Sequence, residues 1–451
     1  MSEETIASAE EPDGAPRIAV LDILRGVAIL GILFMNINDM GASFRAGIDI
    51  RHFGWTPADQ VAWWLRAVFA DGTARCLLQM LFGAGMVILT GRIADAAGRW
   101  AVMRRYYLRN IILILFGLIH MFILLWGGDI LHTYGIAALV VFWLRNLRPR
   151  WLISIGLIMA LLQLFGGGYF SVYRETQHRA EIATLRARHD AATALTAQDR
   201  QILAQAAKDD AARAKHRAER KAEVAQEDRD RSSTTASWIA EQLRMSVERL
   251  FGSGELFAIR EAASVMLLGA ALFKLGIVQG LRSRRFYWRM ILLAYLIGGA
   301  LRALAAYDIT RFDDAPHLFW ATEEIARQAM TLGHVGLINL LVTSLFGARL
   351  MRPFIAAGRT ALSIYVLQTL ICLWLLYPPF GLAWYGTQGW AALMVTALIV
   401  DLFLLLLANL YIRHFRIAPV EWAWRSLVEG RRLPFRLASA HGFQQIGAIS
   451  P

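Results

Sequence analysis

The chain has 451 residues, of which 57% are hydrophobic and 18% are charged. A water-soluble domain could not cover so much apolar surface with so few charged side chains, so the composition excludes an ordinary soluble protein and favours one solvated by lipid. The net charge of +12 does not indicate a nucleic-acid partner. Most of the arginines lie in short loops between apolar stretches, which is the positive-inside pattern of membrane proteins.

Residues 1–17 are polar and acidic and lack the basic and then apolar order of a cleaved signal peptide, so the first apolar stretch is expected to be retained. Apolar stretches near the length that crosses a bilayer core recur along nearly the whole chain. They predict an all-α polytopic membrane protein with about ten transmembrane helices, at roughly 18–40, 76–91, 109–126, 130–144, 151–170, 257–280, 287–306, 326–347, 354–376 and 389–412.

Arginine clusters fall on alternate loops, after the second, fourth, sixth and eighth apolar stretches and in the tail from Arg413. The opposite short loops hold fewer. This asymmetry predicts that both termini are cytoplasmic, and we expect a multi-pass protein of a bacterial cytoplasmic (inner) membrane.

The composition changes between Arg174 and Arg231 to Ala, Arg, Lys, Asp and Glu without Gly or Pro. Strong helix formers with interspersed opposite charges favour a solvated helical hairpin, with disorder as the alternative. The expected divisions are a polar cytoplasmic segment at 1–17, spans one to five at 18–173, an extracytoplasmic insert at 174–256, spans six to ten at 257–412 and a cytoplasmic amphipathic and basic tail at 413–451.

Two further features are a segment rich in tryptophan before the second span and the two cysteines. Segment 59–70, with Trp63, Trp64 and Arg66, is either an interfacial amphipathic helix or the start of a longer, tilted second span. Cys76 and Cys372 each lie inside an apolar stretch, so neither a disulfide framework nor a metal site is expected.

Asp22 and Arg25 are about one helical turn apart in the first span, so they can pair on one face, and Gly26 allows another helix to approach closely. Ionisable groups this close to lipid usually face a bundle interior or a cavity. The pair is either an ion pair at the membrane edge or part of an anion or cofactor site that faces the cytoplasm.

Asp22-x-x-Arg25-Gly26, with a polar residue eleven positions after the arginine, resembles the opening helix of the transmembrane acyltransferase superfamily, which includes heparan-alpha-glucosaminide N-acetyltransferase. The wider chain more specifically resembles the YeiB-like family of bacterial membrane proteins, whose function is largely unassigned. The matching stretches stand in the family's order and cover the chain apart from the insert: LFGAG at 81–85, GLIH at 117–120, GDIL at 128–131, GRTAL at 358–362, LQT at 367–369 and PVEWAWR at 419–425.

The superfamily resemblance implies acyl transfer from a cytosolic acyl-CoA such as acetyl-CoA to an extracytoplasmic sugar or lipid, with a histidine moving the proton. In the O-acyltransferase branch that histidine lies eleven residues after the arginine, where this chain has Asn36. An amide cannot act as a general base at neutral pH, so that version of the mechanism is excluded. The branch similar to the heparan N-acetyltransferase has a histidine in the following loop with a tryptophan three residues later, as His52 and Trp55 are here. His52 is therefore either the catalytic base or a solvated loop histidine.

His120 lies inside the third span and Asp129 near its outer end. A histidine there is either a hydrogen-bonding packing residue or, as part of a family motif, a catalytic one that Asp129 could orient. About two and a half turns separate the two residues, so they are not expected to touch within one straight helix, although a hairpin could bring them together. His334 in the eighth span is a weaker candidate of the same kind.

Arginine side chains at the cytoplasmic ends of the spans either grip a phosphate or a lipid headgroup or extend to the membrane interface. Gln368 could bond to another helix or to a ligand. The residues expected to bind a CoA donor or a lipid are Asp22, Arg25, Asn36, Arg359, Gln368 and Arg425.

The leading interpretation is a transmembrane acyltransferase that uses acyl-CoA as a donor substrate, with His52, His120 and Asp129 as candidate catalytic residues and no permanently bound cofactor or metal. The alternative is a non-enzymatic lipid or metabolite carrier on the same scaffold. A homodimer is expected only because related acyltransferases form one. The chain contains no nucleotide-binding loop, dinucleotide fingerprint or Cys/His cluster that would favour other chemistry.

Overall fold

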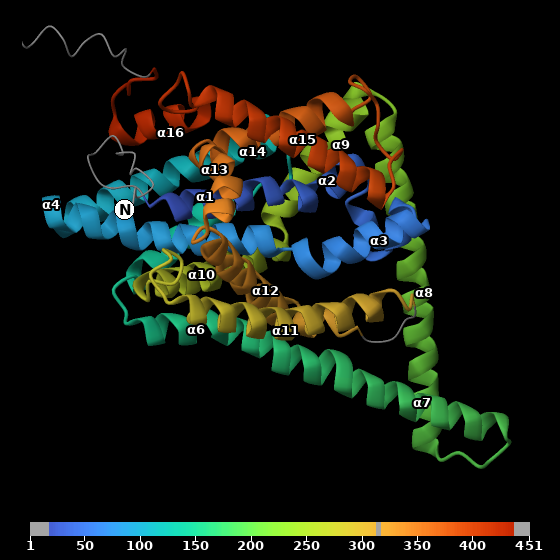
Figure 1. Cartoon of the computed structure of the whole chain (residues 1–451). Helices are drawn as coiled ribbons and strands as arrows, with labels where there is room; N and C mark the ends of the chain where they lie inside the picture. The colour runs from blue at the N-terminus through green and yellow to red at the C-terminus, as the bar shows by residue number, and fades with distance from the viewer. Residues whose placement is uncertain (1–17, 313–316, 437–451) are drawn as a thin grey trace, which may run out of the picture.

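The computed structural model describes residues 18–312 and 317–436, and within these ranges the regular structure is helical apart from one isolated bridge between Phe415 and Arg436 (Figure 1). The expected N-terminal segment 1–17 and the end of the expected tail, 437–451, lie outside the described residues. The α-helices are α1 Ala19–Gly31, α2 Leu33–Gly41, α3 Pro57–Leu65, α4 Thr73–Phe122, α5 Leu131–Val141, α6 Pro149–Leu162, α7 Glu175–Asp190, α8 Ala197–Ser232, α9 Thr235–Phe251, α10 Ser253–Lys274, α11 Arg284–Ile309, α12 Phe319–Leu341, α13 Leu345–Arg359, α14 Ala361–Ile371, α15 Trp390–Tyr411 and α16 Pro419–Glu429. Shorter 3-10 and π segments are η1 Arg45–Ile48, η2 Ile50–Phe53, η3 Arg66–Ala70, η4 Phe142–Leu144, η5 Gln163–Arg174 and η6 Cys372–Leu376.

Among the described residues, six helical stretches are long and apolar enough to cross a membrane, or seven if the bent pair α12 and α13 counts as one. The six are Ala19–Gly41, Pro57–Gly91, Pro149–Asp190, Ser253–Lys274, Arg284–Ile309 and Trp390–Tyr411. Two shorter apolar helices, Leu131–Leu144 and Ala361–Leu376, lie between them in sequence. The expected all-helical, multi-pass architecture is therefore confirmed at this level.

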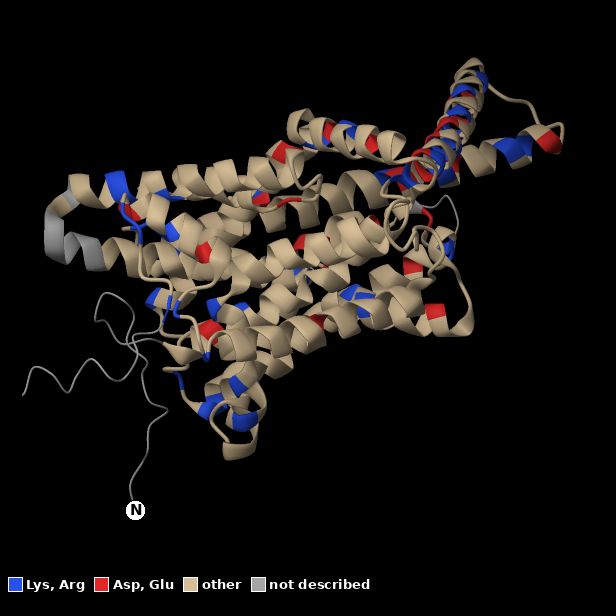
Figure 2. Cartoon of the chain, turned by 90° about the horizontal axis from the view of Figure 1, so that it is seen from above, with Lys and Arg blue, Asp and Glu red and all other residues tan. Residues whose placement is uncertain are grey.

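The second and third expected spans form one element, α4, whose two halves meet at Gly98. The φ of Gly98 is 78°, a left-handed conformation that glycine adopts without steric cost. The chain turns back at this residue, so the two halves of α4 run in opposite directions (Figures 1 and 2). Segment 59–70 leads into α4 within one apolar stretch, Pro57–Gly91, which agrees with the longer second span.

The expected single span 354–376 is wrong, because the helix breaks at Thr360 into α13 and α14. α13 is bent by 116° relative to α12 and crosses the neighbouring helices (Figure 1). It packs closely against α1: a Cβ added to Gly26 would lie 2.1 Å from the Phe354 carbonyl oxygen, and one added to Gly358 would lie 1.9 Å from that of Asp22. The close helix approach expected at Gly26 is confirmed.

The insert is helical, so the disordered alternative is wrong. α7 continues from α6 through η5, and α8 returns to the bundle beside the first loop, so that the insert forms an arm at one end of the molecule (Figure 1). Thr196 caps α8 and forms a capping box with Asp199. α9 then packs on the bundle with Trp238 fully buried.

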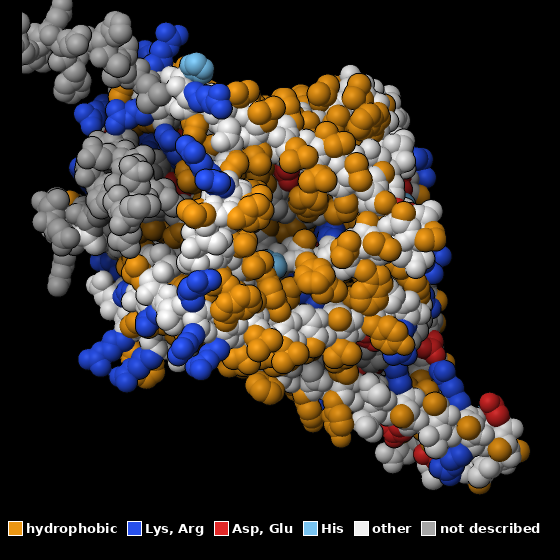
Figure 3. All heavy atoms as spheres, viewed as in Figure 1, with side chains coloured by type: hydrophobic (Ala, Val, Ile, Leu, Met, Phe, Trp, Pro, Cys, Tyr) orange, Lys and Arg blue, Asp and Glu red, His pale blue; other side chains and the backbone are white. Residues whose placement is uncertain are grey.

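The surface of the bundle has the pattern of a protein embedded in lipid. Large apolar side chains are exposed along α11 and α15, including Leu292, Leu296, Ile399 and Phe403, and orange side chains cover most of the face in Figure 3. Lys and Arg gather at the end of the bundle where α1 begins, and a second group of charges lies on the insert at the other end (Figures 2 and 3). Such an apolar belt between polar ends is what lipid solvation requires.

Candidate functional site

His120 and Asp129 lie side by side in the interior. α4 ends at Phe122, and Leu125 adopts a φ of 59°, so the chain reverses and returns Asp129 to the last turn of the helix. His120 Nδ1 lies 2.8 Å from Asp129 Oδ1, and both residues are at most 2% exposed. The expected separation within one straight helix does not apply, because the helix does not continue as far as Asp129.

The Asp129 carboxylate is held in place by the start of α5. Its Oδ2 accepts hydrogen bonds from the backbone N–H groups of Leu131, at 2.9 Å, and His132, at 3.1 Å, and lies 2.9 Å from His132 Nδ1. Two N–H donors at a helix start stabilise a negative charge, so Asp129 can accept the Nδ1 proton of His120 in a hydrogen bond.

Thr369 on α14 completes an aligned set of three side chains. His120 Nε2 lies 2.9 Å from Thr369 Oγ1, and Thr369 is fully buried. When Asp129 fixes the proton of His120 on Nδ1, the lone pair of Nε2 faces the threonine hydroxyl. A carboxylate, an imidazole and a hydroxyl in this order form the arrangement by which proteins activate a hydroxyl as a nucleophile.

The hydrogen-bonded chain extends from Asp129 in the other direction. His132 Nε2 lies 3.2 Å from Glu255 Oε1, and the Thr133 hydroxyl donates to the same oxygen at 2.7 Å. Glu255 is near the start of α10, and its Oε2 lies 3.9 Å from Arg249 Nε. The polar chain therefore leads from Thr369 toward Arg249, which is 34% exposed at the end of the bundle that carries the insert.

A second buried polar contact lies one residue from Thr369. The Gln368 amide donates to the Ile29 carbonyl oxygen at 3.1 Å and to Asp401 Oδ1 at 3.0 Å. Gln368 Oε1 and Asp401 Oδ2 are buried and have no hydrogen-bond partner among the residues that the structure describes. Such unsatisfied polar atoms cost free energy, which makes this position a candidate for binding a polar group.

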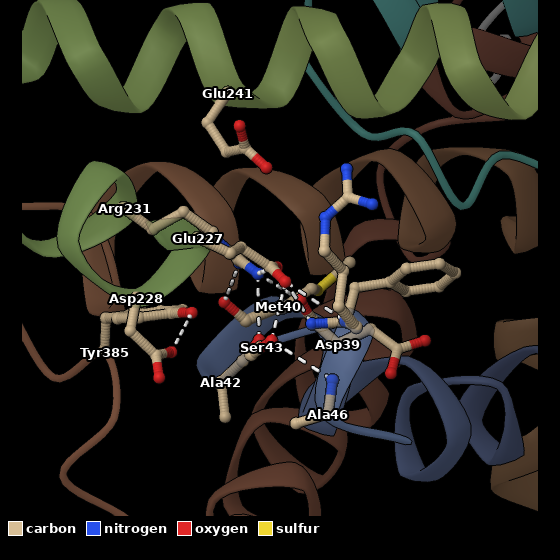
Figure 4. Close-up of polar contacts among 12 residues, drawn as sticks. Asp39, Met40, Ala42, Ser43, Ala46, Glu227, Asp228, Arg231, Glu241 and Tyr385 are labelled. Carbon is tan, nitrogen blue, oxygen red and sulfur yellow. Dashed lines mark hydrogen bonds and ion pairs between the residues drawn. The ribbon is translucent and has the colours of Figure 1, made fainter. Parts of the chain in front are cut away.

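His52 lies elsewhere, at the surface of the end that carries the insert. Its Nε2 is 3.2 Å from Asp228 Oδ2 of α8, and the Tyr385 hydroxyl donates to Asp228 Oδ1 at 2.8 Å (Figure 4). These residues line a cavity of about 270 Å³ together with Phe53, Ser232 and Gln388. The insert thus supplies one wall of the cavity around His52.

The electrostatics of this cavity couple the two charged groups. The hydrogen bond to Asp228 raises the pKa of His52 above its ordinary value. Partial burial opposes ionisation of Asp228, but its hydrogen bonds with His52 and Tyr385 outweigh that effect and lower its pKa. Burial raises the pKa of the Tyr385 hydroxyl, so it remains protonated and acts as a donor.

A buried ion pair fastens α8 beside this cavity. The Arg231 guanidinium donates to the carbonyl oxygens of Asp39, Met40 and Ala42 at the end of α2, at 2.7–3.0 Å. Glu227 lies 3.1 Å from Arg231 and accepts from the Ser43 hydroxyl and two backbone N–H groups (Figure 4). Both charged side chains are fully buried, so they dock the insert on the first loop.

The residues expected to bind a CoA donor or a lipid are only partly brought together. Arg25 donates to Asp22 at 2.9 Å, as the pattern predicted, while Asn36 lies half-buried on α2. Arg359 and Arg425 are also half-buried and have interaction partners. Gln368 belongs to the interior contact with Asp401 instead.

Glu421 of the PVEWAWR stretch has a structural role. Its carboxylate accepts hydrogen bonds from the N–H groups of Leu362 and Ser363, at 2.7 and 3.1 Å, and from the Ser363 hydroxyl. It thereby caps α14, the helix that carries Thr369. Burial raises the pKa of Glu421, and these hydrogen bonds oppose that shift.

A further group of charges is buried between α4, α10 and α12. Arg327, which is fully buried, lies 3.0 Å from Glu261 and 2.6 Å from Glu324, and Arg75 lies 3.1 Å from Glu261. His334 Nε2 donates to the Phe69 carbonyl oxygen at 2.9 Å, and His334 Nδ1 lies 2.8 Å from the Tyr295 hydroxyl. This pairing favours the packing interpretation of His334.

Comparison with known proteins places these residues in a family context. Residues 272–431 match the family model described as Protein of unknown function (DUF418). The chain is 27% identical to YxaH of Bacillus subtilis (strain 168) in an alignment 428 residues long that covers 91% of this chain and 94% of YxaH. It is 28% identical to YeiB of Escherichia coli (strain K12) in an alignment 420 residues long that covers 91% of this chain and 96% of YeiB. The predicted YeiB-like resemblance is confirmed. Both relatives are described as uncharacterized proteins, and no solved structure matches the chain.

The DUF418 match covers one side of the interior site. It includes Thr369, Asp401 and Glu421, whereas His120 and Asp129 lie before it. Sequence reasoning missed His132, Glu255, Thr369, Asp401 and Asp228 as site residues. Thr369 stands in the LQT stretch, and Asp401 is a carboxylate within an apolar span, so each carried a signal of its own.

Proposed function

We propose that this YeiB-like protein is a transmembrane acyltransferase of the superfamily that its first helix resembles, with His120 as the general base. The single observation that carries the proposal is the buried alignment of Asp129, His120 and Thr369, with separations of 2.8 and 2.9 Å. The proposed donor substrate is a cytosolic acyl-CoA, and the proposed acceptor is an extracytoplasmic sugar or lipid.

The alignment supports a two-step transfer. Thr369 Oγ1 attacks the thioester carbonyl carbon, its proton passes to His120 Nε2, the carbon–sulfur bond breaks, and that proton leaves with the thiolate as CoA thiol. In the second step an acceptor hydroxyl or amine attacks the threonyl ester, His120 takes the acceptor's proton, and it returns the proton to Thr369. Asp129 orients the imidazole and stabilises its charged form in both steps.

The burial of Thr369 supports a transfer that crosses the membrane. Since the side chain is fully buried, an acyl group reaches it only through the helix bundle. In this proposal the acceptor binds at the opposite end, in the cavity that His52 and Asp228 line. His52 then positions the acceptor, and His120 replaces the base that Asn36 cannot supply.

The proposed topology has ten crossings, with α13 at the interface and both termini in the cytoplasm of a bacterial inner membrane. The crossings would be α1 with α2, the two halves of α4, α5, α6, α10, α11, α12, α14 and α15. The gathering of Lys and Arg at the end of the bundle where α1 begins supports this orientation (Figure 3). A homodimer remains part of the proposal on the resemblance alone.

The test is incubation of the detergent-purified protein with acetyl-CoA labelled in its acetyl group, with release of CoA thiol and label on the protein as readouts. We expect thiol release and a labelled peptide that contains Thr369. His120→Gln should lower the rate by at least about a hundredfold, the usual effect of removing a general base.

His334→Gln is the matched control, because it removes another histidine of the helix bundle that lies outside the aligned set. It should leave thiol release unchanged. Absence of thiol release from the unmodified protein, together with an unchanged melting midpoint in acetyl-CoA and CoA, would contradict the enzymatic proposal.

A carrier is the second candidate, and the contact between Gln368 and Asp401 favours it. The unpartnered Gln368 Oε1 and Asp401 Oδ2 could bind a polar cargo group as it passes through the bundle. If acetyl-CoA produces neither turnover nor a shift in the melting midpoint, a carrier function is the better explanation, because it accounts for the buried polar atoms without an acyl-transfer reaction.

A further inference from the structure

A groove lies where α13 crosses the end of α15, away from the interior site. Its volume is about 510 Å³, within the range of ligand-binding clefts. The guanidinium groups of Arg349 and Arg352 on α13 and Arg413 after α15 line it, and all three side chains are exposed. Arg349 and Arg352 are three residues apart on one helix and therefore share a face.

The floor of the groove is apolar and contains one amide. Ile355, Ala356 and Ile412 line it, and Asn409 uses its NH₂ group to donate to the carbonyl oxygens of Pro353, at 3.1 Å, and Leu405, at 2.8 Å. Both amide protons are thereby occupied, so the Asn409 oxygen is what remains for a ligand and can accept a hydrogen bond from a hydroxyl.

The charge of the groove has one sign. No carboxylate occurs among the described residues that line it, so three positive charges surround the opening without an acidic partner in the lining. Guanidinium groups are suited to phosphate because their forked N–H donors match its oxygens. The chemistry that fits is a singly charged phosphodiester with a neighbouring hydroxyl.

The surroundings of the groove contain exposed apolar residues as well as charges. Leu345, Phe346 and Leu350 on α13 are all more than half exposed. The bend of 116° between α12 and α13 turns α13 across the bundle. The arginines and the exposed apolar side chains both belong to this short helix, so they lie close to one another. A ligand that touches both must carry a phosphate and a hydrocarbon chain.

We propose that this groove binds the headgroup phosphate of an anionic phospholipid, with Arg349, Arg352 and Arg413 around the phosphate and the acyl chains against the apolar side of α13. This proposal does not depend on the acyltransferase proposal, and it places lipid recognition on residues other than Arg25, Arg359 and Arg425.

The test is native mass spectrometry of the detergent-purified chain with added phosphatidylglycerol, and with phosphatidylcholine, inorganic phosphate or CoA in separate arms. We expect bound phosphatidylglycerol and much less of the zwitterionic lipid. Replacing Arg349, Arg352 and Arg413 by Gln should weaken phosphatidylglycerol binding by about a hundredfold, since each basic side chain near an anionic surface contributes about a fivefold effect and the three effects multiply.

A matched control replaces Arg284, Arg285 and Arg289 by Gln, which removes the same charge from exposed positions on α11 that do not line the groove. Phosphatidylglycerol binding should persist in that variant. Equal losses in both variants would overturn the proposal in favour of general attraction to a basic surface. If inorganic phosphate or CoA binds with the same dependence on the three arginines, the proposal that the bound phosphate belongs to a phospholipid would be wrong.

Because the substituted side chains are exposed, both variants should fold, and their melting midpoints in neutral detergent check this. A groove variant that melts like the unmodified protein and binds phosphatidylglycerol equally well would also overturn the proposal.

Discussion

The hydroxyl of Thr369 is the atom that separates catalysis from packing in the interior site. Thr369→Val keeps the shape of the side chain and removes the hydroxyl, so it should abolish acetyl label at this position and lower thiol release by at least about a hundredfold. Label and release are measured with acetyl-CoA as donor. The variant leaves the buried His120 Nε2 without its hydroxyl partner, so it should cost about 1–3 kcal/mol of stability.

Thr369→Ser is the control for that variant, because serine keeps a hydroxyl at this position, where the threonine hydroxyl lies 2.9 Å from His120 Nε2. It should retain both the label and the release of thiol. If Thr369→Val turns over acetyl-CoA as well as Thr369→Ser does, the hydroxyl is a packing group and the covalent step is wrong.

The pair of His52 and Asp228 should make stability depend on pH. The pKa of His52 is raised above 6.5, so its contribution is fully present below that value and is lost as the pH rises through the raised pKa. The pKa of Asp228 is lowered below 3.8, so it stays ionised throughout that window. The melting midpoint of the unmodified protein should therefore exceed that of His52→Gln at mildly acidic pH, and the difference should vanish at alkaline pH.

The exposed His189 in the last turn of α7 provides the comparison for that pH series, because it lies outside the cavity. His189→Gln should melt like the unmodified protein at every pH. A difference between the unmodified protein and His52→Gln that stays constant with pH would contradict the ion pair.

Contacts between individual side chains could be predicted from the sequence where the partners lie within one helical turn of each other. Asp22, Arg25 and Gly26 lie within one turn, so sequence spacing alone predicted their pair and the close helix approach. His120 and Asp129 could not be paired in this way, because their contact depends on a chain reversal with a positive φ at Leu125, a residue type that gives no such signal. Thr369 joins them across 249 residues, and no local pattern encodes that distance.

At the scale of elements, the insert depends on two buried charges for its attachment. Arg231→Gln removes the guanidinium that binds three carbonyl oxygens and leaves Glu227 buried without its cation. Breaking one partner of a buried pair typically costs about 3–5 kcal/mol. We therefore expect a lower melting midpoint and faster tryptic cleavage within α8.

Arg186→Gln is the matched change, because it breaks an ion pair with Asp210 in which both side chains are about half exposed. Exposed pairs contribute little, so this variant should melt and be cleaved like the unmodified protein. Similar behaviour of Arg231→Gln would show that the insert is held mainly by α9 and Trp238.

The helical character of the insert followed from its composition, but its docking did not. Glu227 and Arg231 stand in a run of alternating charges, and nothing in the sequence distinguishes them from their exposed neighbours. The break at Thr360 was missed for a related reason: the apolar composition continues across it, and the close packing of α13 on α1 at Gly26 and Gly358 joins residues that are far apart in the sequence. Apolar length thus predicts where helices occur better than where they end.

At the scale of the whole molecule, charge asymmetry and surface pattern agree. Arginine-rich loops that are distant in sequence meet at one end of the bundle, and the apolar belt separates them from the insert (Figures 2 and 3). The positive-inside rule could predict this grouping because it depends on loop composition and not on packing. The interior polar groups, in contrast, required the assembled bundle.

The orientation can be tested with single introduced cysteines, because Cys76 and Cys372 are both fully buried and should not react. Ala194→Cys lies in the exposed turn of the insert, and Asn146→Cys lies in the exposed loop between η4 and α6. In spheroplasts of a bacterial host, a membrane-impermeant maleimide should label Ala194→Cys. It should label Asn146→Cys only after lysis, because that loop belongs to the arginine-rich side. Labelling of Asn146→Cys in intact spheroplasts with protection of Ala194→Cys would invert the topology, and with it the side from which acyl-CoA must enter.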